Sequence, residues 1–307
     1  MKTFAVLFPG QGSQFVGMGS DVFEQRSELL GPAADDALGW SLRSVVAEGP
    51  EEELTRTDRA QPALYAISYA LWDVLRDALA REPAATAGHS LGEYTALAAS
   101  GALDFTDGLG LVAERGEAMA EAAALESSTM AALMGVDAKG AEQMAADRRA
   151  EGGKLWVANL NAPGQIVLAG SLEDVDWLLA NADRFGARRA IALNVAGAFH
   201  SPYMAPAAEL LATALDSTGF AEGRFPVYAN VSAAPMTDPP AELARQLTEP
   251  VRFAELIERM AGDGIDAFIH VGPGNVTAGL ARRGAPDAHT YTVSEIDDIA
   301  GAVEFIE

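Results

Sequence analysis

The chain contains no cysteine. Disulfides, thiolate metal sites and a cysteine nucleophile are therefore excluded, and any covalent catalysis has to use Ser, Thr, Lys, Asp or Glu. No apolar run approaches the roughly 20 residues that a membrane-spanning helix needs. Residues 1–8 faintly resemble a signal peptide, but the apolar stretch is too short and Pro9 ends it. We therefore expect a buried first strand and a cytoplasmic protein.

Positive charge is also scarce. The formal net charge is -23, and lysine occurs only at positions 2, 139 and 154. Nucleic acids and anionic membranes need a basic footprint, so neither is expected as a partner. The acidity itself is typical of adaptation for solubility or high salt. An acidic protein partner would need a local basic patch, for which the candidates are the arginine pairs at 148–149, 188–189 and 282–283.

What is present is typical of a globular protein with a sizeable core. The 307 residues are 49% hydrophobic and 21% charged, which fits one large domain or a core with a smaller subdomain. Residues 4–8 are expected to form a buried strand that ends in the glycine-rich turn at 9–14. Further along, the pattern predicts a helix at 62–80, a strand at 84–87 and a helix at 93–99.

Residues 129–195 form a distinct block. Strands are expected at 130–136, 155–160, 165–169 and 189–195, and helices at 138–150 and 172–185. The order β-α-β-β-α-β is that of a ferredoxin-like unit. Strands alternate with helices on both sides of the block, which indicates a parallel α/β core. We predict a core of residues 1–126 and 197–307 with a ferredoxin-like subdomain at 127–196; later core elements are helices at 206–217 and 251–263 and strands at 227–231 and 267–271.

The segment Gly88-His89-Ser90-Leu91-Gly92 matches G-x-S-x-G, the nucleophile elbow. In such an elbow the serine sits on a tight turn between a strand and a helix. The hydroxyl is exposed, and the next backbone N–H points at the developing oxyanion. The predicted strand before Ser90 and helix after it favour this interpretation over an ordinary glycine-flanked turn.

A serine nucleophile needs a base within hydrogen-bond reach. The chain has four histidines. His89 adjoins Ser90, and neighbouring side chains on an elbow point apart. His270 lies in a very apolar strand, where a satisfied core histidine is the usual case, and His289 lies in a polar stretch. His200 follows the subdomain's last predicted strand in a loop, where functional residues concentrate, so we favour it as the base.

Arg115 lies on the apolar stripe of a helix predicted at 107–123, four residues from both Leu111 and Met119. Two interpretations stay open. The side chain extends its head to the surface, or its charge is buried and needs an anion from the protein or a ligand. A substrate carboxylate would suit the planar guanidinium.

The loop Gly10-Gln11-Gly12-Ser13 is rich in glycine but matches neither phosphate-binding motif. G-x-x-x-x-G-K-[ST] is absent, and Phe15 stands where G-x-G-x-x-G needs its last glycine. We interpret the loop as a backbone N–H donor that faces the serine.

Six motifs at these residues resemble the malonyl-CoA:acyl carrier protein transacylases and the related acyltransferase domains of polyketide synthases. The resemblance covers nearly the whole chain, and the six motifs in order are very specific. They are FPGQGSQ at 8–14, GHSLGE at 88–93, ERG at 114–116, NLNAPGQ at 159–165, AFHS at 198–201 and VGPG at 271–274. The family fold is an α/β-hydrolase-like core with an inserted ferredoxin-like subdomain, in agreement with the element order.

The resemblance implies a role for each site residue. Ser90 attacks the malonyl thioester, and His200 is its base. The backbone N–H groups of Gln11 and Leu91 form the oxyanion hole. Arg115 binds the free malonyl carboxylate.

Three further positions follow from the same resemblance. The backbone carbonyl that orients the histidine belongs to Gln246, which explains the lack of a convincing third acid. Asn161 lines the pocket. The motif Ala198-Phe199-His200 accompanies malonyl in the polyketide domains, where serine before the histidine accompanies methylmalonyl. Phe199 would fill the space that a branch methyl group needs.

The implied reaction is a ping-pong transfer of malonyl from malonyl-CoA to the phosphopantetheine thiol of an acyl carrier protein, for fatty-acid or polyketide synthesis. The chemistry is expected to need no metal and no bound cofactor; malonyl-CoA is counted as a substrate. The protein is expected to be a monomer. Two rival functions are an acyl hydrolase and a non-catalytic carrier-binding module. A hydrolase of neutral acyl chains has no use for Arg115, and a non-catalytic module has none for Ser90 and His200.

Overall fold

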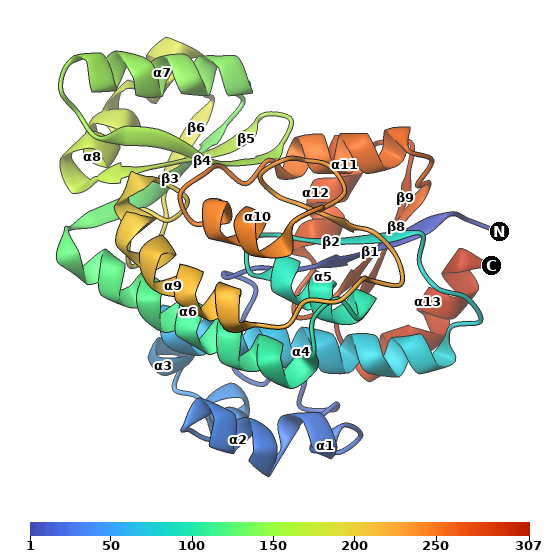
Figure 1. Ribbon diagram of the computed structural model, residues 1–307. Helices are drawn as coiled ribbons and strands as arrows, with labels where there is room; N and C mark the ends of the chain where they lie inside the picture. Colours follow the sequence, from blue (N-terminus) through green and yellow to red (C-terminus); the bar gives the residue numbers. More distant parts are fainter.

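The computed structural model describes residues 1–307 and contains two sheets. The first has five parallel strands in the order β7-β2-β1-β8-β9, and the second has four antiparallel strands in the order β4-β5-β3-β6. The second sheet forms a separate lobe with α7 and α8 (Figure 1). The parallel strands are β1 (Phe4–Phe8), β2 (Ala85–Gly88), β7 (Val227–Tyr228), β8 (Ala267–Val271) and β9 (His289–Val293).

Strand β1 lies in the middle of the first sheet and is buried on both faces. Phe4, Val6 and Phe8 join one hydrophobic cluster with α4, α5 and α6, whereas Ala5 and Leu7 join another with α11 and α12. A parallel sheet covered on both faces has continuous apolar strands, which explains the unbroken run FAVLF. The covering helices are α4 (Thr57–Ala78), α5 (Gly92–Ser100), α6 (Phe105–Leu125), α11 (Phe253–Gly262) and α12 (Val276–Gly284).

The core has further helical segments, of which α13 packs against α4 and the edge strand β9. The chain ends are close together, because the Lys2 N–H donates to the Ile306 carbonyl at 3.2 Å. No helix combines the length and the apolar character that a membrane span requires. The further segments are α1 (Ser27–Leu30), α2 (Pro32–Leu38), η1 (Ser44–Glu48), α3 (Glu51–Thr55), η3 (Pro202–Met204), α9 (Ala205–Ser217), α10 (Pro239–Gln246), η4 (Ile296–Asp298) and α13 (Ile299–Ile306).

The second sheet has the ferredoxin-like arrangement. Its strand order corresponds to 2-3-1-4 within the lobe, and α7 and α8 pack against one face through a cluster of their own. The predicted fold class, a parallel α/β core with a ferredoxin-like insertion, is therefore confirmed. The lobe contains β3 (Ser128–Met134), α7 (Ala138–Ala150), β4 (Leu155–Ala162), β5 (Gln165–Ser171), α8 (Leu172–Asn181), η2 (Ala182–Phe185) and β6 (Arg189–Ala192). The domain limits 126/127 and 196/197 stay a prediction.

Several predicted bounds were wrong, and each error has a local cause. β6 ends at Ala192 instead of 195, because residues 193–195 leave the sheet to line a cavity. β7 is only two residues long, since the chain turns at Asn230. β9 was missed because only Val293 of its five residues is buried, so its apolar pattern is weak.

Candidate active site

The candidate site lies at the carboxyl ends of three neighbouring parallel strands. Gln11 follows β1, Ser90 follows β2 and Asn230 follows β7. Phe8 pairs with Gly88, so the first two strands end at the same level. Because the carboxyl ends of parallel strands meet at one edge of the sheet, the loops after them converge there.

The serine stands on a strained turn. Ser90 has φ 51, in the left-handed region that non-glycine residues rarely adopt. A Cβ on Gly88 would collide with the backbone of Gly92, and a Cβ on Gly92 would collide with the carbonyl of Phe8. The two glycines of the elbow are therefore required by the close approach of α5 to the ends of β1 and β2.

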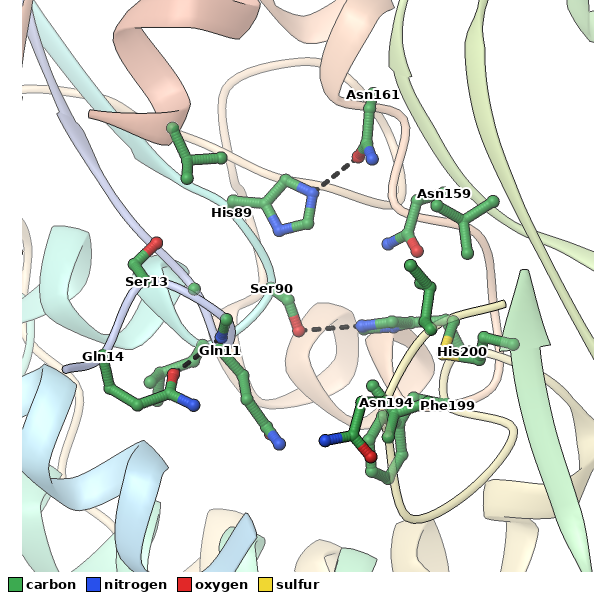
Figure 2. A pocket seen from close by; sticks show the side chains of 18 of the residues that line it. Gln11, Ser13, Gln14, His89, Ser90, Asn159, Asn161, Asn194, Phe199 and His200 are labelled. Carbon is green, nitrogen blue, oxygen red and sulfur yellow. Dashed lines mark hydrogen bonds between the residues drawn. The ribbon is translucent and has the colours of Figure 1, made fainter. Parts of the chain in front are cut away.

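The side chains of Ser90 and His200 point toward each other and are hydrogen-bonded (Figure 2). Ser90 Oγ is 2.8 Å from His200 Nε2, and His200 Nδ1 is 2.7 Å from the Gln246 carbonyl oxygen. A carbonyl can only accept, so Nδ1 carries the proton and Nε2 offers its lone pair to the serine hydroxyl. Burial lowers the pKa of His200 to about 3, and the charge of Arg115 acts in the same direction. The imidazole is thus neutral at ordinary pH.

Arg115, on α6, is 1% exposed, so the interpretation in which its head reaches the surface is wrong. Its Nη2 donates to Ser90 Oγ at 3.2 Å and to Gln246 Oε1 at 2.9 Å, and Nη1 donates to Gln61 Oε1. The Tyr94 ring centroid lies 5.3 Å from the guanidinium carbon. Every acceptor is uncharged. A buried cation therefore lies beside the Ser90 hydroxyl with no carboxylate bonded to it.

Two backbone N–H groups of the cavity wall are free of backbone partners. Neither Gln11 nor Leu91 uses its N–H in the backbone hydrogen bonds of the protein. The Gln11 side chain donates to Thr57 Oγ1 at 3.3 Å, which holds the loop after β1. Gln11 lies on the side of Ser90 opposite His200 (Figure 2). Both residues line the same cavity as the serine.

The cavity has a volume of about 460 Å³ and lies between the core and the lobe. A pocket of this size accommodates a small organic ligand. Asn161, on β4, lines it and bonds through Oδ1 to His89 Nε2 at 2.7 Å. Phe199 is 6% exposed and lines the wall next to His200. Further lining residues include Ser13, Gln14, Asn159, Gln165, Asn194, Val276 and Leu280.

The other histidines do not reach the serine. His89 points towards the lobe, where it contacts Asn161, and its ring lies 5.3 Å from that of Phe253. His270 is fully buried, with Nδ1 2.5 Å from Thr277 Oγ1 and Nε2 3.0 Å from the Gly272 carbonyl, as expected for a satisfied core residue. His289 is exposed on β9.

Sequence reasoning missed two residues of the site, Asn230 and Glu93. Asn230 Oδ1 accepts from the Ser90 N–H at 2.7 Å, and its Nδ2 donates to the Gly88 carbonyl at 2.7 Å. Glu93 is 1% exposed and bonds to both Asn230 and Gln246. A charged residue directly after the elbow, in an otherwise apolar segment, was a signal for Glu93. Nothing in the pattern around the two-residue strand β7 singled out Asn230.

Comparison with known proteins assigns the chain to a family. Residues 5–296 match the model of the acyl transferase domain. The malonyl CoA-acyl carrier protein transacylase of Bacillus subtilis is 43% identical over 100% of this chain and 98% of that protein. The transacylase of the same name from Escherichia coli K12 is 39% identical over 99% and 100%.

Solved structures agree with this assignment. An acyl carrier protein S-malonyltransferase from Vibrio cholerae superposes with a TM-score of 0.92 at 37% identity, over 98% of this chain and 99% of that one. A malonyl-transacylase in complex with its type II polyketide synthase acyl-carrier protein has a TM-score of 0.93 at 36% identity, over 98% and 99%.

We expect acid to destabilise the protein in part through His270. Burial lowers the pKa of His270 to about 4, whereas the unshifted value is 6.5. Between these values the unfolded chain binds a proton that the folded chain does not. Stability that is present above pH 6.5 is therefore lost as the pH falls, by about 2 kcal/mol at about pH 5 for one such group.

Urea denaturation at about pH 7.5 and about pH 5 measures this loss. His270→Gln should reduce the difference between the two pH values by about 2 kcal/mol, whatever its effect on absolute stability. His289→Gln, at an exposed position, should leave the difference unchanged. An undiminished difference in His270→Gln would show that another group takes up the proton.

Proposed function

The chain belongs to the acyl transferase domain family and, within it, to the malonyl-CoA–acyl carrier protein transacylases, and from this premise we propose how its residues transfer the malonyl group. Like its relatives, the enzyme moves malonyl from malonyl-CoA to an acyl carrier protein. The observation that carries the residue assignment is the bonded pair Ser90–His200 with the buried Arg115 beside it.

In the first half-reaction, Ser90 Oγ attacks the thioester carbonyl, and its proton moves to His200 Nε2. The N–H groups of Gln11 and Leu91 hold the negative oxygen of the tetrahedral intermediate. The C–S bond then breaks, and the departing coenzyme A sulfur takes the proton from His200. The Gln246 carbonyl stabilises the imidazolium that exists between these two transfers and keeps the ring oriented.

The second half-reaction reverses these steps with a different thiol. The phosphopantetheine thiol of the carrier gives its proton to His200 and attacks the malonyl ester. The C–O bond to Ser90 breaks, and the serine oxygen recovers a proton from Nε2. Because coenzyme A leaves before the carrier's thiol reacts, the kinetics are ping-pong.

Arg115 selects an acyl group that ends in a carboxylate. Its guanidinium is buried and bonded only to uncharged acceptors, so a substrate carboxylate supplies the missing counter-charge through paired hydrogen bonds. Its distance of 3.2 Å from Ser90 Oγ suits a short dicarboxylic chain such as malonyl. A neutral acyl chain would leave the charge without a partner, which disfavours the hydrolase.

Phe199 is proposed to exclude a branch at the carbon between the two carbonyl groups. Its ring lines the cavity next to His200 and is 6% exposed, so most of its surface packs against the protein. Discrimination by one methyl group in an apolar pocket is limited to about 1–3 kcal/mol, so methylmalonyl would be disfavoured but not fully excluded.

The carrier is proposed to dock on a cationic rim of the cavity, made of Arg188, Arg189, Arg282 and Arg283. All four are exposed. Arg283 donates to Gln165, a residue of the cavity wall, and the Arg188 side chain packs over Gly135, which is bonded to Gly164 beside Gln165. The third candidate pair is neutralised, because Arg148 and Arg149 form ion pairs with Asp174, Glu151, Glu173 and Glu142.

We also propose that the protein is a monomer and that it is located in the cytoplasm. The net charge of -23 disfavours self-association through like-charge repulsion. The location follows from the two water-soluble substrates.

Intact-protein mass spectrometry after brief mixing with malonyl-CoA tests the mechanism. We expect a one-malonyl adduct in wild type and none in Ser90→Ala. Arg115→Ala should form the adduct at least about 30-fold more slowly, because losing one partner of a buried charge pair costs about 2–5 kcal/mol. Arg259→Ala, an exposed arginine on α11, should behave as wild type. An adduct that decays in water without carrier would favour the hydrolase.

Phe199→Ser should weaken the preference for malonyl over methylmalonyl by about 5- to 150-fold. The measurement is the ratio of the two adduct formation rates in the same variant, so a general loss of activity cancels. A ratio equal to that of wild type would show that Phe199 does not set this preference.

Charge reversal at the rim tests carrier docking. The double variant Arg188→Glu/Arg189→Glu should raise the KM for carrier protein about tenfold or more, most strongly at low salt, and leave adduct formation from malonyl-CoA unchanged. Arg43→Glu, an exposed arginine on the N-terminal side of η1, is the matched control. An equal loss with malonyl-CoA would mean that the rim binds the coenzyme instead.

A further inference from the structure

Glu93 is a buried acid that the mechanism above does not use. It lies in the first turn of α5, three residues after Ser90, and is 1% exposed. Its Oε1 accepts from the Asn230 N–H at 2.9 Å, and its Oε2 accepts from Gln246 Nε2. Both carboxyl oxygens thus face N–H donors, which fits an ionised carboxylate.

Each hydrogen-bond partner of Glu93 is itself bonded to a residue with a proposed role in the reaction. Asn230 grips the elbow from both sides, accepting from the Ser90 N–H and donating to the Gly88 carbonyl, each at 2.7 Å. Gln246 holds His200 through its main-chain carbonyl and holds Arg115 through Oε1 at 2.9 Å. Glu93 is therefore the one side chain that bonds both to Asn230, which fixes the Ser90 turn, and to Gln246, which orients His200.

The hydrogen bonds to Gln246 have a fixed direction. Arg115 can only donate, so it requires the amide oxygen, and the Ser90 carbonyl can only accept, so it requires the amide nitrogen, which donates to it at 2.9 Å. The amide nitrogen then also faces Glu93, which has to accept. A donor at position 93 would oppose this direction and favour rotation of the amide, which would turn its NH₂ group towards the Arg115 guanidinium.

We propose that Glu93 is a positioning residue for the malonyl transfer: its carboxylate fixes the elbow through Asn230 and orients the Gln246 amide so that the oxygen faces Arg115. This inference rests on the proposed roles of Ser90, His200 and Arg115. Glu93 touches no reacting atom, and its effect on the substrate passes through Gln246.

Burial and the hydrogen-bond partners of Glu93 act on its charge in opposite directions. Burial raises the pKa of the Glu93 carboxyl to about 8, whereas the hydrogen bonds from Asn230 and Gln246 and the charge of Arg115 favour the ionised form. The carboxylate that accepts both hydrogen bonds therefore predominates only above about pH 8, and the rates below are compared there. The carboxylate and the guanidinium are separated by one amide group. When it is ionised, Glu93 lessens the cost of burying Arg115 without occupying the guanidinium edge that the substrate needs.

The variant Glu93→Gln distinguishes the two hydrogen bonds of Glu93, one to Asn230 and one to Gln246. Its amide oxygen can still accept from the Asn230 N–H, but its NH₂ group opposes Gln246 Nε2. We expect malonyl-adduct formation to fall by about tenfold to a hundredfold, the effect of an unsatisfied buried polar group. Labelling of Ser90 by a fluorophosphonate, which does not use Arg115, should stay within about threefold of wild type.

Glu242→Gln is the matched control. Glu242, on α10, is also a buried acid and is 8% exposed. Its side chain accepts from the Ser232 hydroxyl and the Thr237 N–H and bonds to no site residue. Both rates should be unchanged in this variant. Thermal melting of all variants identifies any general loss of stability.

A double-mutant cycle gives the decisive comparison. In an Arg115→Ala background, Glu93→Gln should have almost no further effect on adduct formation, because the direction of the Gln246 amide no longer matters there. Additive effects, or equal losses of labelling and adduct formation in Glu93→Gln, would overturn the proposal in favour of a purely structural role. A normal adduct rate in Arg115→Ala alone would instead refute the proposed role of Arg115.

If Glu93→Gln does not fold, Glu93→Asp serves in its place. The shorter side chain keeps the charge but cannot reach both partners. Adduct formation should again fall more than labelling, and equal falls would overturn the proposal.

Discussion

The charge of Arg115 is buried beside the hydroxyl of Ser90, and this is the constraint on which the rest of the site depends. A buried cation is costly unless hydrogen bonds and an anion compensate it. Here the acceptors that bond to it are Gln61, Gln246 and Ser90, all uncharged, and the proposed function assigns the bonded anion to the substrate. Burial and, to a smaller extent, the same cation lower the pKa of His200, so its imidazole is neutral, as the proposed base requires.

The parallel sheet supplies the geometry that this charge needs. The elbow after β2 exposes Ser90, and the loop after β1 faces it because the two strands end in register. The glycines at 88 and 92 allow α5 to approach the sheet so closely that side chains cannot fit between them. The lobe then closes the cavity through Asn161 and Gln165, so one pocket is formed by parts of the chain that are far apart in sequence.

The helices and strands that have a strong local sequence pattern could be predicted from the sequence. The bounds of β1, β8 and α7 match their predicted ranges, because long apolar or amphipathic runs end at clear turn residues. β7 and β9 were poorly predicted, since they are held by pairing with neighbours more than by their own pattern. Asn230 could not be found for the same reason: its importance comes from the proximity of Ser90, 140 residues away in sequence.

Gln246 shows how a side chain and a main-chain group of one residue can serve different needs. Any residue type could supply the carbonyl that orients His200, so that role alone places no demand on the side chain at this position. The amide, however, must accept from Arg115 and donate to Ser90 O and Glu93 at once. Glutamate could not donate, and an aliphatic residue could do neither. The charge of Arg115 and the carboxylate of Glu93 therefore explain the choice of glutamine, which the orientation of the base does not.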